Sequence, residues 1–466
     1  MIKSRWFIAT ITVIGMVALF LSATIYRSPF DLGEWLASPY ATWMLTQGKN
    51  PYPVRNLQIP PRQELSMMAL LGKKIFFDAS LSGSGKQSCA SCHNPASAFA
   101  PDNNLSVQLG GDDLHHAGAR AVPSLTYLYR QQNFSIGPDN PENESNNLQQ
   151  AAALNALTAR TQKNTRNTQT SAASMVPQGG LFWDGRVNTL QQQADGPLFN
   201  PAEMNAGNIA TVAKKLNHAA YIGDFVQLFG SGVLRDPSLL VSEALFALAR
   251  FQIEDTHFHS FSSKYDAWLQ GKARFTDSET RGYAVFNNPA KGNCAACHLD
   301  QVTREGLPPL FTDNQYEALG VPRNSAIPAN LDGQYYDMGL CGPYREDLKE
   351  QARFCGMFIT PGLRNVATRK AFFHNGVYHT LEDVLNFYNF RDTAPQRIYA
   401  ADTGGHIEKF NDLPQQKRTN VDVTDPPFNR KLGETPVMSN QDMRDVIAFL
   451  QTLNDGYASS GIAAKP

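Results

Sequence analysis

The sequence has no excess of charge of either sign. Its 466 residues contain 41 Lys and Arg side chains against 42 Asp and Glu side chains, so the formal net charge is −1. No run rich in Lys and Arg stands out along the chain. Proteins that bind nucleic acid through its phosphates need such a basic excess, so no nucleic acid partner is expected.

No class of amino acid is unusually frequent or rare in the chain. Hydrophobic residues make up 42% of the chain, charged residues 18% and aromatic residues 10%. These values exclude collagen-like, wholly disordered and polytopic membrane proteins. At roughly 100–200 residues per domain, the chain that follows the N-terminal segment predicts two or three domains with cores of their own.

The N-terminal segment differs from the rest of the chain. Lys3 and Arg5 precede a stretch from Ile8 to Ile25 that has no charged side chain. This stretch is longer than a usual signal-peptide core and can span a bilayer. We therefore predict that residues 1–26 anchor the protein in the inner membrane, with everything after a linker at 27–61 on the periplasmic side. A cleaved signal peptide, which would leave the protein free in the periplasm, is the alternative.

Cysteine is scarce, but four of the six cysteines fall into two Cys-x-x-Cys-His motifs, Cys89-Ala-Ser-Cys92-His93 and Cys294-Ala-Ala-Cys297-His298. Two thiols about one helical turn apart can both add to the vinyl groups of one haem, and the adjacent imidazole then becomes an axial ligand. We predict two covalently bound haem c groups, with His93 and His298 on the irons. Zinc half-sites or disulfides would explain the thiol pairs but not the histidine after each pair.

The other two cysteines, Cys341 and Cys355, lie close together in the sequence. In an exported chain they predict a disulfide, which would stabilise the fold by on the order of 3 kcal/mol through loop closure. Two free thiols are the alternative.

The two haem motifs lie in similar surroundings, which indicates an internal repeat. Gly72-Lys-Lys-Ile-Phe76 precedes the first motif and Gly282-Tyr-Ala-Val-Phe286 the second, and each is expected to end a helix. We predict a mainly α-helical fold with two cytochrome c-like haem domains and long loops, over 62–265 and 275–455. A polar insertion at 131–180, whose stretch 139–180 has no aromatic residue, is expected to be a long surface loop.

Several longer stretches carry a family resemblance. They are Leu71-Gly-Lys-Lys-Ile-Phe-Phe-Asp78, Phe182-Trp-Asp-Gly-Arg186, Asn200-Pro-Ala-Glu-Met204 and Phe373-His-Asn-Gly376. In this order they resemble the bacterial dihaem cytochrome c peroxidases, a family that also includes the methylamine utilisation protein MauG. The resemblance runs from about residue 62 to 455. It implies a peroxidatic N-terminal haem, a C-terminal haem that exchanges electrons, and a tryptophan between them.

The resemblance implies roles for three residues near the first haem. Trp183 matches the tryptophan between the haems, where an indole would assist electron transfer. Peroxide cleavage needs a group that moves a proton between the two peroxide oxygens and polar groups that hold the oxidant. The matching positions are Glu203 and Gln193. Without the resemblance, Trp183 would be interpreted as a core residue and the other two as surface groups.

The resemblance also suggests a histidine on the loop after the first motif that binds the first iron until reduction releases it. His115 and His116 are the candidates, and His116 is the one assigned. Their distance from Pro123 is shorter than in the family, so plain surface-loop residues are the alternative. In that case the first haem would be five-coordinate without reductive activation.

The sixth ligand of the second haem is predicted to be Tyr388. An ungapped count from His374 places Tyr388 where the peroxidases have methionine and MauG has tyrosine. An anionic oxygen donor stabilises higher iron oxidation states, whereas methionine raises the potential. Tyr388 also belongs to an apolar helical stripe, so a core role is the alternative, and Met338 or Met357 would then be possible ligands.

Two further expectations follow from the resemblance. His374 matches a histidine near the second haem, with a structural hydrogen-bonding role equally open. The family also binds calcium between its domains, but the matching positions here are Ala121, Arg369 and Ala371. Side-chain ligation is lost at these positions, which puts calcium in doubt, although backbone carbonyls and water could still bind it.

The predicted function is reduction of hydrogen peroxide at the His93 haem, with electrons passed through the His298 haem from a small donor protein. One alternative is a MauG-like enzyme that uses peroxide to oxidise residues of a partner protein, with Tyr388 as the distinguishing feature. A second alternative is a non-catalytic electron-transfer cytochrome. Glu203 and Gln193 argue against it, because a carrier needs no peroxide pocket.

Overall fold

The structure is a computed structural model that describes residues 39–138, 175–401 and 404–458. The predicted anchor, residues 1–26, and most of the aromatic-free stretch 139–180 lie outside these ranges. Within the described ranges, no helix has the length and apolar character needed to cross a membrane.

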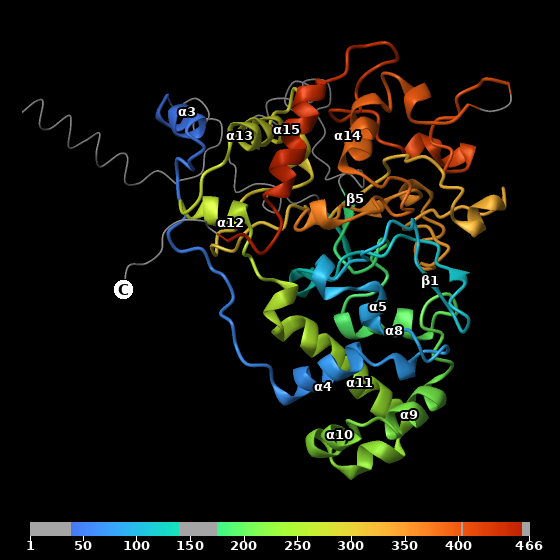
Figure 1. Ribbon diagram of the computed structural model, residues 1–466. Coiled ribbons are helices and arrows are strands. Elements are labelled where there is room, and N and C mark those ends of the chain that lie inside the picture. The colour runs from blue at the N-terminus through green and yellow to red at the C-terminus, as the bar shows by residue number, and fades with distance from the viewer. Residues whose placement is uncertain (1–38, 139–174, 402–403, 459–466) are drawn as a thin grey trace, which may run out of the picture.

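The described chain is mainly helical, as the sequence predicts (Figure 1). Its α-helices are α3 (Pro39–Thr46), α4 (Met67–Phe76), α5 (Cys89–Cys92), α8 (Leu190–Phe199), α9 (Ile209–Asn217), α10 (Ile222–Phe229), α11 (Pro237–Glu254), α12 (Lys264–Leu269), α13 (Asp277–Phe286), α14 (Leu381–Phe390) and α15 (Asn440–Gln451). The short strands pair antiparallel as β1 (Leu109–Gly110) with β2 (His116–Ala117), β3 (Ser135–Pro138) with β4 (Met175–Gln178), and β5 (Tyr316–Glu317) with β6 (Phe358–Ile359).

Helix α4 packs against α11, and the two helices form the centre of the first hydrophobic core. The Ser66 hydroxyl caps the start of α4 by accepting a hydrogen bond from the Ala69 amide. Gly72 lies at the contact between the helices, where an added Cβ would stand 1.9 Å from the carbonyl oxygen of Ala247. Because only glycine lacks a Cβ, it alone allows this approach of the two backbones.

The same packing recurs in the second half of the chain, where α13 lies against α15. Helix α13 begins with the capping box of Thr276 and Glu279 that its sequence predicts. An added Cβ on Gly282 would stand 1.9 Å from the carbonyl oxygen of Asp445 on α15. Figure 1 shows α4 and α9–α11 together at one end of the molecule and α12–α15 at the other. The repeat indicated by Gly72 and Gly282 is therefore a repeat of one helix–helix contact.

Hydrogen bonds join the two halves along the chain that follows β2. The Ala121 amide donates to the His374 carbonyl oxygen over 2.7 Å. The Tyr127 hydroxyl donates to the Asp455 carboxylate, also over 2.7 Å. This segment of the first half therefore lies against the second half.

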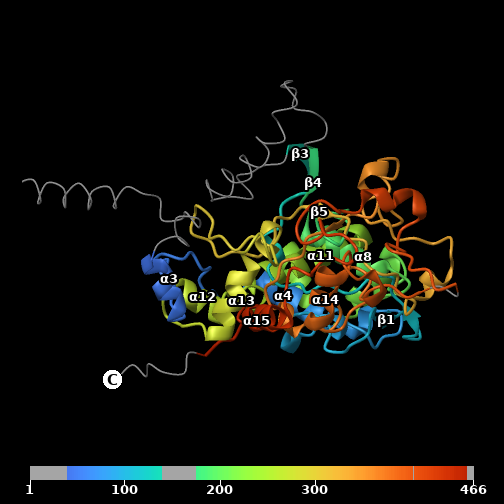
Figure 2. The ribbon, with the colours of Figure 1, turned by 90° about the horizontal axis from the view of Figure 1, so that it is seen from above.

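Strands β3 and β4 form the two ends of the polar insertion. Ser135 pairs with Gln178, and Figure 2 shows the two strands projecting beside β5. The Tyr316 hydroxyl donates to the Gly179 carbonyl oxygen over 2.6 Å. The base of the insertion is thus fixed to the second half of the chain.

The contact at Gly72 makes a stability prediction. Gly72→Ala is expected to lower the free energy of unfolding by about 1–3 kcal/mol, because the new methyl group overpacks the contact between α4 and α11. Gly223→Ala is the matched control, since Gly223 lies in helix α10 with nothing within 4 Å of an added Cβ. The control should be neutral or stabilising. Equal denaturation midpoints for the two variants would contradict the account of the contact.

Candidate functional site

Each Cys-x-x-Cys-His motif forms a single tight turn that ends at its histidine. The first motif forms α5, with His93 as its C-cap, and the second begins with a short turn at Cys294–Ala296. The Nδ1–H group of His93 donates to the Phe99 carbonyl oxygen over 3.0 Å. His298 repeats this bond to Phe311 over 2.9 Å. In both rings Nε2 therefore keeps the lone pair that a metal needs.

Each motif faces a cavity of its own. Cys89, Cys92 and His93 line a first cavity of about 180 Å³. Cys294, Cys297 and His298 line a second, larger cavity of about 1330 Å³. Burial lowers the pKa of both imidazoles to about 4, so each histidine is neutral and able to bind iron.

The thiols are arranged for attachment to haem rather than for zinc or disulfides. All four motif cysteines are free, and burial raises the pKa of Cys89 and Cys294 to about 12. In the described part of the chain, one group of three or more His, Cys, Asp or Glu side chains converges closely enough to hold a metal ion. It is the exposed set of Asp112, Asp113 and His116. Neither motif belongs to such a group, so the donor set fits one haem per cavity.

Trp183 lines both cavities. Its indole Nε1–H donates to the Ala121 carbonyl oxygen over 2.8 Å, which fixes the ring against the segment that joins the two halves. The tryptophan therefore forms part of the wall that the two cavities share.

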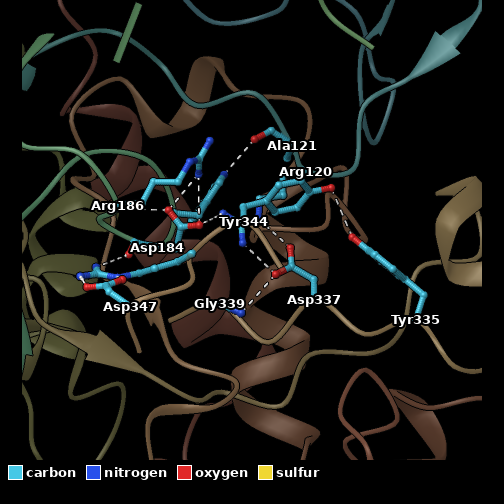
Figure 3. Close-up of polar contacts among 11 residues, drawn as sticks. Arg120, Ala121, Asp184, Arg186, Tyr335, Asp337, Gly339, Tyr344 and Asp347 are labelled. Atoms are coloured by element: carbon cyan, nitrogen blue, oxygen red, sulfur yellow. Dashed lines mark hydrogen bonds and ion pairs between the residues drawn. The ribbon is translucent and has the colours of Figure 1, made fainter. Parts of the chain in front are cut away.

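A buried network of ion pairs holds the Trp183 segment in place (Figure 3). Arg120 Nη1 donates to Asp184 Oδ2 over 2.8 Å, and Arg120 Nε donates to Asp337 Oδ2 over 2.6 Å. Burial opposes ionisation of Asp337, but the charge and hydrogen bonds of Arg120 outweigh it and hold the pKa of this carboxyl below its usual value. Arg186 Nη1 adds a bond to Asp184 Oδ1 over 2.9 Å.

No motif in the sequence indicates this network. Tyr344 lies over the Arg120 guanidinium at 4.8 Å and lines the first cavity together with Arg186. The one sequence feature that could have pointed to the network is the Phe182–Arg186 stretch, which ends at Arg186. Arg120, Asp337 and Tyr344 come from loops whose meeting no local pattern predicts.

Glu203 lines the first cavity, where the loop after α8 brings its carboxyl to the cavity that holds His93. Burial raises the pKa of Glu203, although Asn200 and Arg186 oppose this. The side-chain amide of Asn200 donates a hydrogen bond to Glu203 Oε1 over 2.6 Å. The Gly111 amide donates to the Glu203 carbonyl oxygen over 2.7 Å. The carboxyl is thus oriented by its hydrogen bonds, and burial makes it hold a proton more readily than an exposed carboxyl does.

Gln193 is buried on α8 and lines both cavities. Its amide can donate and accept hydrogen bonds. The structure therefore brings Gln193, Glu203 and Trp183 to the first cavity, as the resemblance implied.

His115 and His116 do not reach this cavity. Both side chains are exposed, at 81% and 53%, and face Asp113 and Asp112 on their own loop. Leu109 and Gly118, at the two ends of the short hairpin of β1 and β2, line the first cavity, but the two histidines do not. The structure thus places both histidines on the surface and outside the first cavity, which favours the surface-loop alternative; ligation of the first iron by His116 stays a prediction.

Tyr388 lines the second cavity together with His298. Its ring lies on α14 and stacks on Phe428, with the ring centroids 5.4 Å apart. Burial raises the pKa of this phenol above its usual value. A buried phenol loses its proton only if a cation compensates the charge, and a haem iron would be such a cation.

The methionines named as alternative ligands lie elsewhere. Met338 and Met357 pack in a small core around the Cys341–Cys355 disulfide, which is present in the structure. Neither lines the two cavities. Met438 does line the second cavity. No sequence pattern pointed to it, because it precedes α15, far from Tyr388 in the sequence.

His374 also lines the second cavity. Its Nε2 lies 3.2 Å from Asp412 Oδ2, and its ring stacks on Phe358 at 3.5 Å between centroids. Burial raises the pKa of Asp412, although His374 opposes this. His374 therefore faces the second cavity and has a hydrogen-bonding partner.

The positions expected to match a calcium site contain a positive charge. The Arg369 Nη2 group donates to the carbonyl oxygens of Val122 and Ala371 over 3.1 and 3.2 Å. Ala121 and Ala371 offer no side-chain oxygen. A guanidinium in this place does not fit a second cation.

Comparisons with known proteins agree with this geometry. The family described as di-haem cytochrome c peroxidase matches residues 66–274. The methylamine utilization protein MauG of Paracoccus denitrificans is 31% identical over 401 residues, which cover 83% of this chain and 88% of that protein. The cytochrome c551 peroxidase of Nitrosomonas europaea is 28% identical over 321 residues, covering 68% and 71%.

A solved structure extends the likeness to the fold. The diheme peroxidase BthA from Burkholderia thailandensis superposes with a TM-score of 0.71 at 35% identity, covering 90% of this chain and 96% of that one. These similarities define a class, the oxidoreductases with two haem groups that use peroxide. This chain belongs to the di-haem cytochrome c peroxidase and MauG family. It is therefore an enzyme, and the alternative of a non-catalytic cytochrome is not supported.

Haem content tests the site directly. Mass spectrometry of the protein, expressed with haem-maturation machinery, should show two covalent haems. Replacing Cys294 and Cys297 by Ser should leave one, because the thioether bonds of the second haem cannot form. The matched control replaces Cys341 and Cys355 by Ser, which also removes two thiols and should leave both haems. Finding fewer than two haems in the unaltered protein would exclude the assignment.

Proposed function

We propose that the enzyme reduces hydrogen peroxide at the His93 haem, with electrons supplied through the His298 haem by a small donor protein. The observation that carries this proposal is the placement of the Glu203 carboxyl in the cavity that contains the His93 imidazole. A haem held there supplies the iron that binds peroxide and accepts its oxidising equivalents. Proton transfer and the binding of peroxide are proposed for the side chains that line the cavity.

Glu203 is proposed to move the proton. In its ionised form it accepts a proton from the peroxide oxygen nearer the iron and returns it to the farther oxygen, which leaves as water. Asn200 keeps the carboxyl oriented through its 2.6 Å bond. Gln193, which is buried, is proposed to hold the peroxide by hydrogen bonds.

Trp183 is proposed to carry electrons between the two cavities. Its contact with both cavities supports this role, and its hydrogen bond to Ala121 keeps the ring in one orientation. The second candidate function, oxidation of residues of a partner protein, uses the same route in the opposite direction. Tyr388 in the second cavity favours that candidate, because an anionic oxygen ligand stabilises oxidised iron.

The periplasmic side of the inner membrane is the proposed location. Lys3 and Arg5 before the uncharged run support an export segment. The Cys341–Cys355 disulfide supports an oxidising compartment.

Glu203→Gln tests the proton-transfer role. It should keep both haems and the fold but lower peroxide turnover by about 10²-fold or more, the usual effect of losing an acid–base group. Turnover of the unaltered enzyme should also fall as the pH drops through the raised pKa of Glu203, because only the ionised carboxyl accepts a proton. The variant should lack this pH dependence. Glu350→Gln, an exposed site, is the control, and equal turnover in both variants would reject the role of Glu203.

Tyr388→Phe distinguishes the two candidate functions. If the phenol oxygen binds the second iron, its removal should change the optical and EPR spectra of that haem and raise its potential. Met438→Leu serves as the control, because it alters another side chain of the same cavity. A silent Tyr388→Phe together with an altered Met438→Leu spectrum would assign a methionine ligand and support the ordinary peroxidase.

A further inference from the structure

Arg369 connects the two halves of the chain through one nitrogen atom. Its Nη2 group donates to Val122, which lines the first cavity, and to Ala371, which precedes His374. Arg369 itself lines the second cavity. The guanidinium therefore lies between the two proposed haem sites.

This guanidinium differs from the other buried arginines. Arg120 has Asp184 and Asp337, and Arg364 has Asp266, as carboxylate partners. Among the described residues, no Asp or Glu side chain forms an ion pair with Arg369. Burial lowers its pKa to about 10, which leaves it charged at neutral pH. The side chain is only partly exposed, and a charge largely removed from water without an opposite charge is costly, so the site favours an anion.

Donor groups remain for such an anion. A guanidinium has five N–H donors, and both hydrogen bonds of Arg369 come from Nη2. Within the described ranges, the donors at Nε and Nη1 have no protein partner, and their side chain lines the second cavity. The haem proposed for this cavity carries propionate carboxylates, which are the planar anions that a guanidinium binds best.

We propose that Arg369 is the fixed cation between the two haem sites, that it pairs with a propionate of the second haem, and that it replaces a calcium ion at this position. The inference rests on the haem proposed for the second cavity. Calcium takes six to eight oxygen ligands. Here two backbone oxygens are already bound to Arg369, and the charge of the guanidinium repels a divalent cation.

The pairing has a consequence for electron transfer. A positive charge held beside a haem favours the reduced iron, which has one positive charge fewer. Arg369 is therefore expected to raise the potential of the second haem and so to offset part of the lowering that an oxygen ligand such as Tyr388 would cause. The charge of Arg369 also acts on His93, whose pKa it helps to lower, so the test reads the potential of the second haem rather than peroxide turnover.

The experiment compares Arg369→Gln, Arg369→Lys and Lys370→Gln in the full chain, using preparations in which mass spectrometry has verified two haems. Arg369→Gln should lower the potential of the second haem, with roughly a tenfold change in its reduction equilibrium, equal to about 59 mV for one electron. Arg369→Lys keeps the charge and should restore most of the potential. Lys370→Gln removes a charge from the exposed neighbouring residue and should change nothing.

Calcium content is the second measurement, and it needs no variant. The unaltered holoprotein, dialysed against calcium-free buffer, should contain far less than one calcium per chain. Added calcium or EGTA should leave its haem spectra and its thermal unfolding unchanged. One bound calcium per chain, or identical potentials for the unaltered protein and Arg369→Gln, would overturn the proposal. A preparation without the second haem would instead refute the haem assignment on which it rests.

Discussion

Two haem sites in separate helical halves can share electrons only if something rigid holds them at a fixed separation. The buried guanidinium of Arg120 provides this constraint, since it binds Asp184 beside Trp183 and Asp337 in the second half. Removal of one partner from such a buried pair typically costs about 3–5 kcal/mol, because the other charge is left uncompensated. The position of the Trp183 wall therefore depends on these ion pairs rather than on hydrophobic packing alone.

The charge states of the side chains around the two cavities suit the binding of haem. Both axial histidines are neutral, because burial lowers their pKa and their Nδ1–H groups are already bonded to carbonyl oxygens. Glu203 is buried beside one of them, so a proton can remain on it more easily than on an exposed carboxyl. On the other side of the wall, Arg369 supplies a positive charge where a haem propionate would bring a negative one.

The sequence predicted the parts of this arrangement that local chemistry determines. The two Cys-x-x-Cys-His motifs, the helix ends at Phe76 and Phe286 and the disulfide all depend on short-range spacing. The mainly helical fold agrees with them. Glu203, Gln193 and Trp183 could be placed only through the family resemblance, because each would otherwise be an ordinary core or surface residue. Arg120, Tyr344 and Met438 come from loops distant in sequence, so neither periodicity nor spacing could bring them to the cavities. The exposed position of His116 could not be foreseen either, because the resemblance gives the order of motifs but not the course of a short hairpin.

The central claim is that the two cavities hold haems that act as one unit across the Trp183 wall. Optical and EPR spectra of the purified protein, recorded at rest and after one equivalent of hydrogen peroxide, test it most directly. The account predicts that one equivalent alters the signals of both haems, because oxidising equivalents generated at the His93 site are shared with the His298 site. A change confined to one haem, with the other signal left as it was at rest, would contradict it.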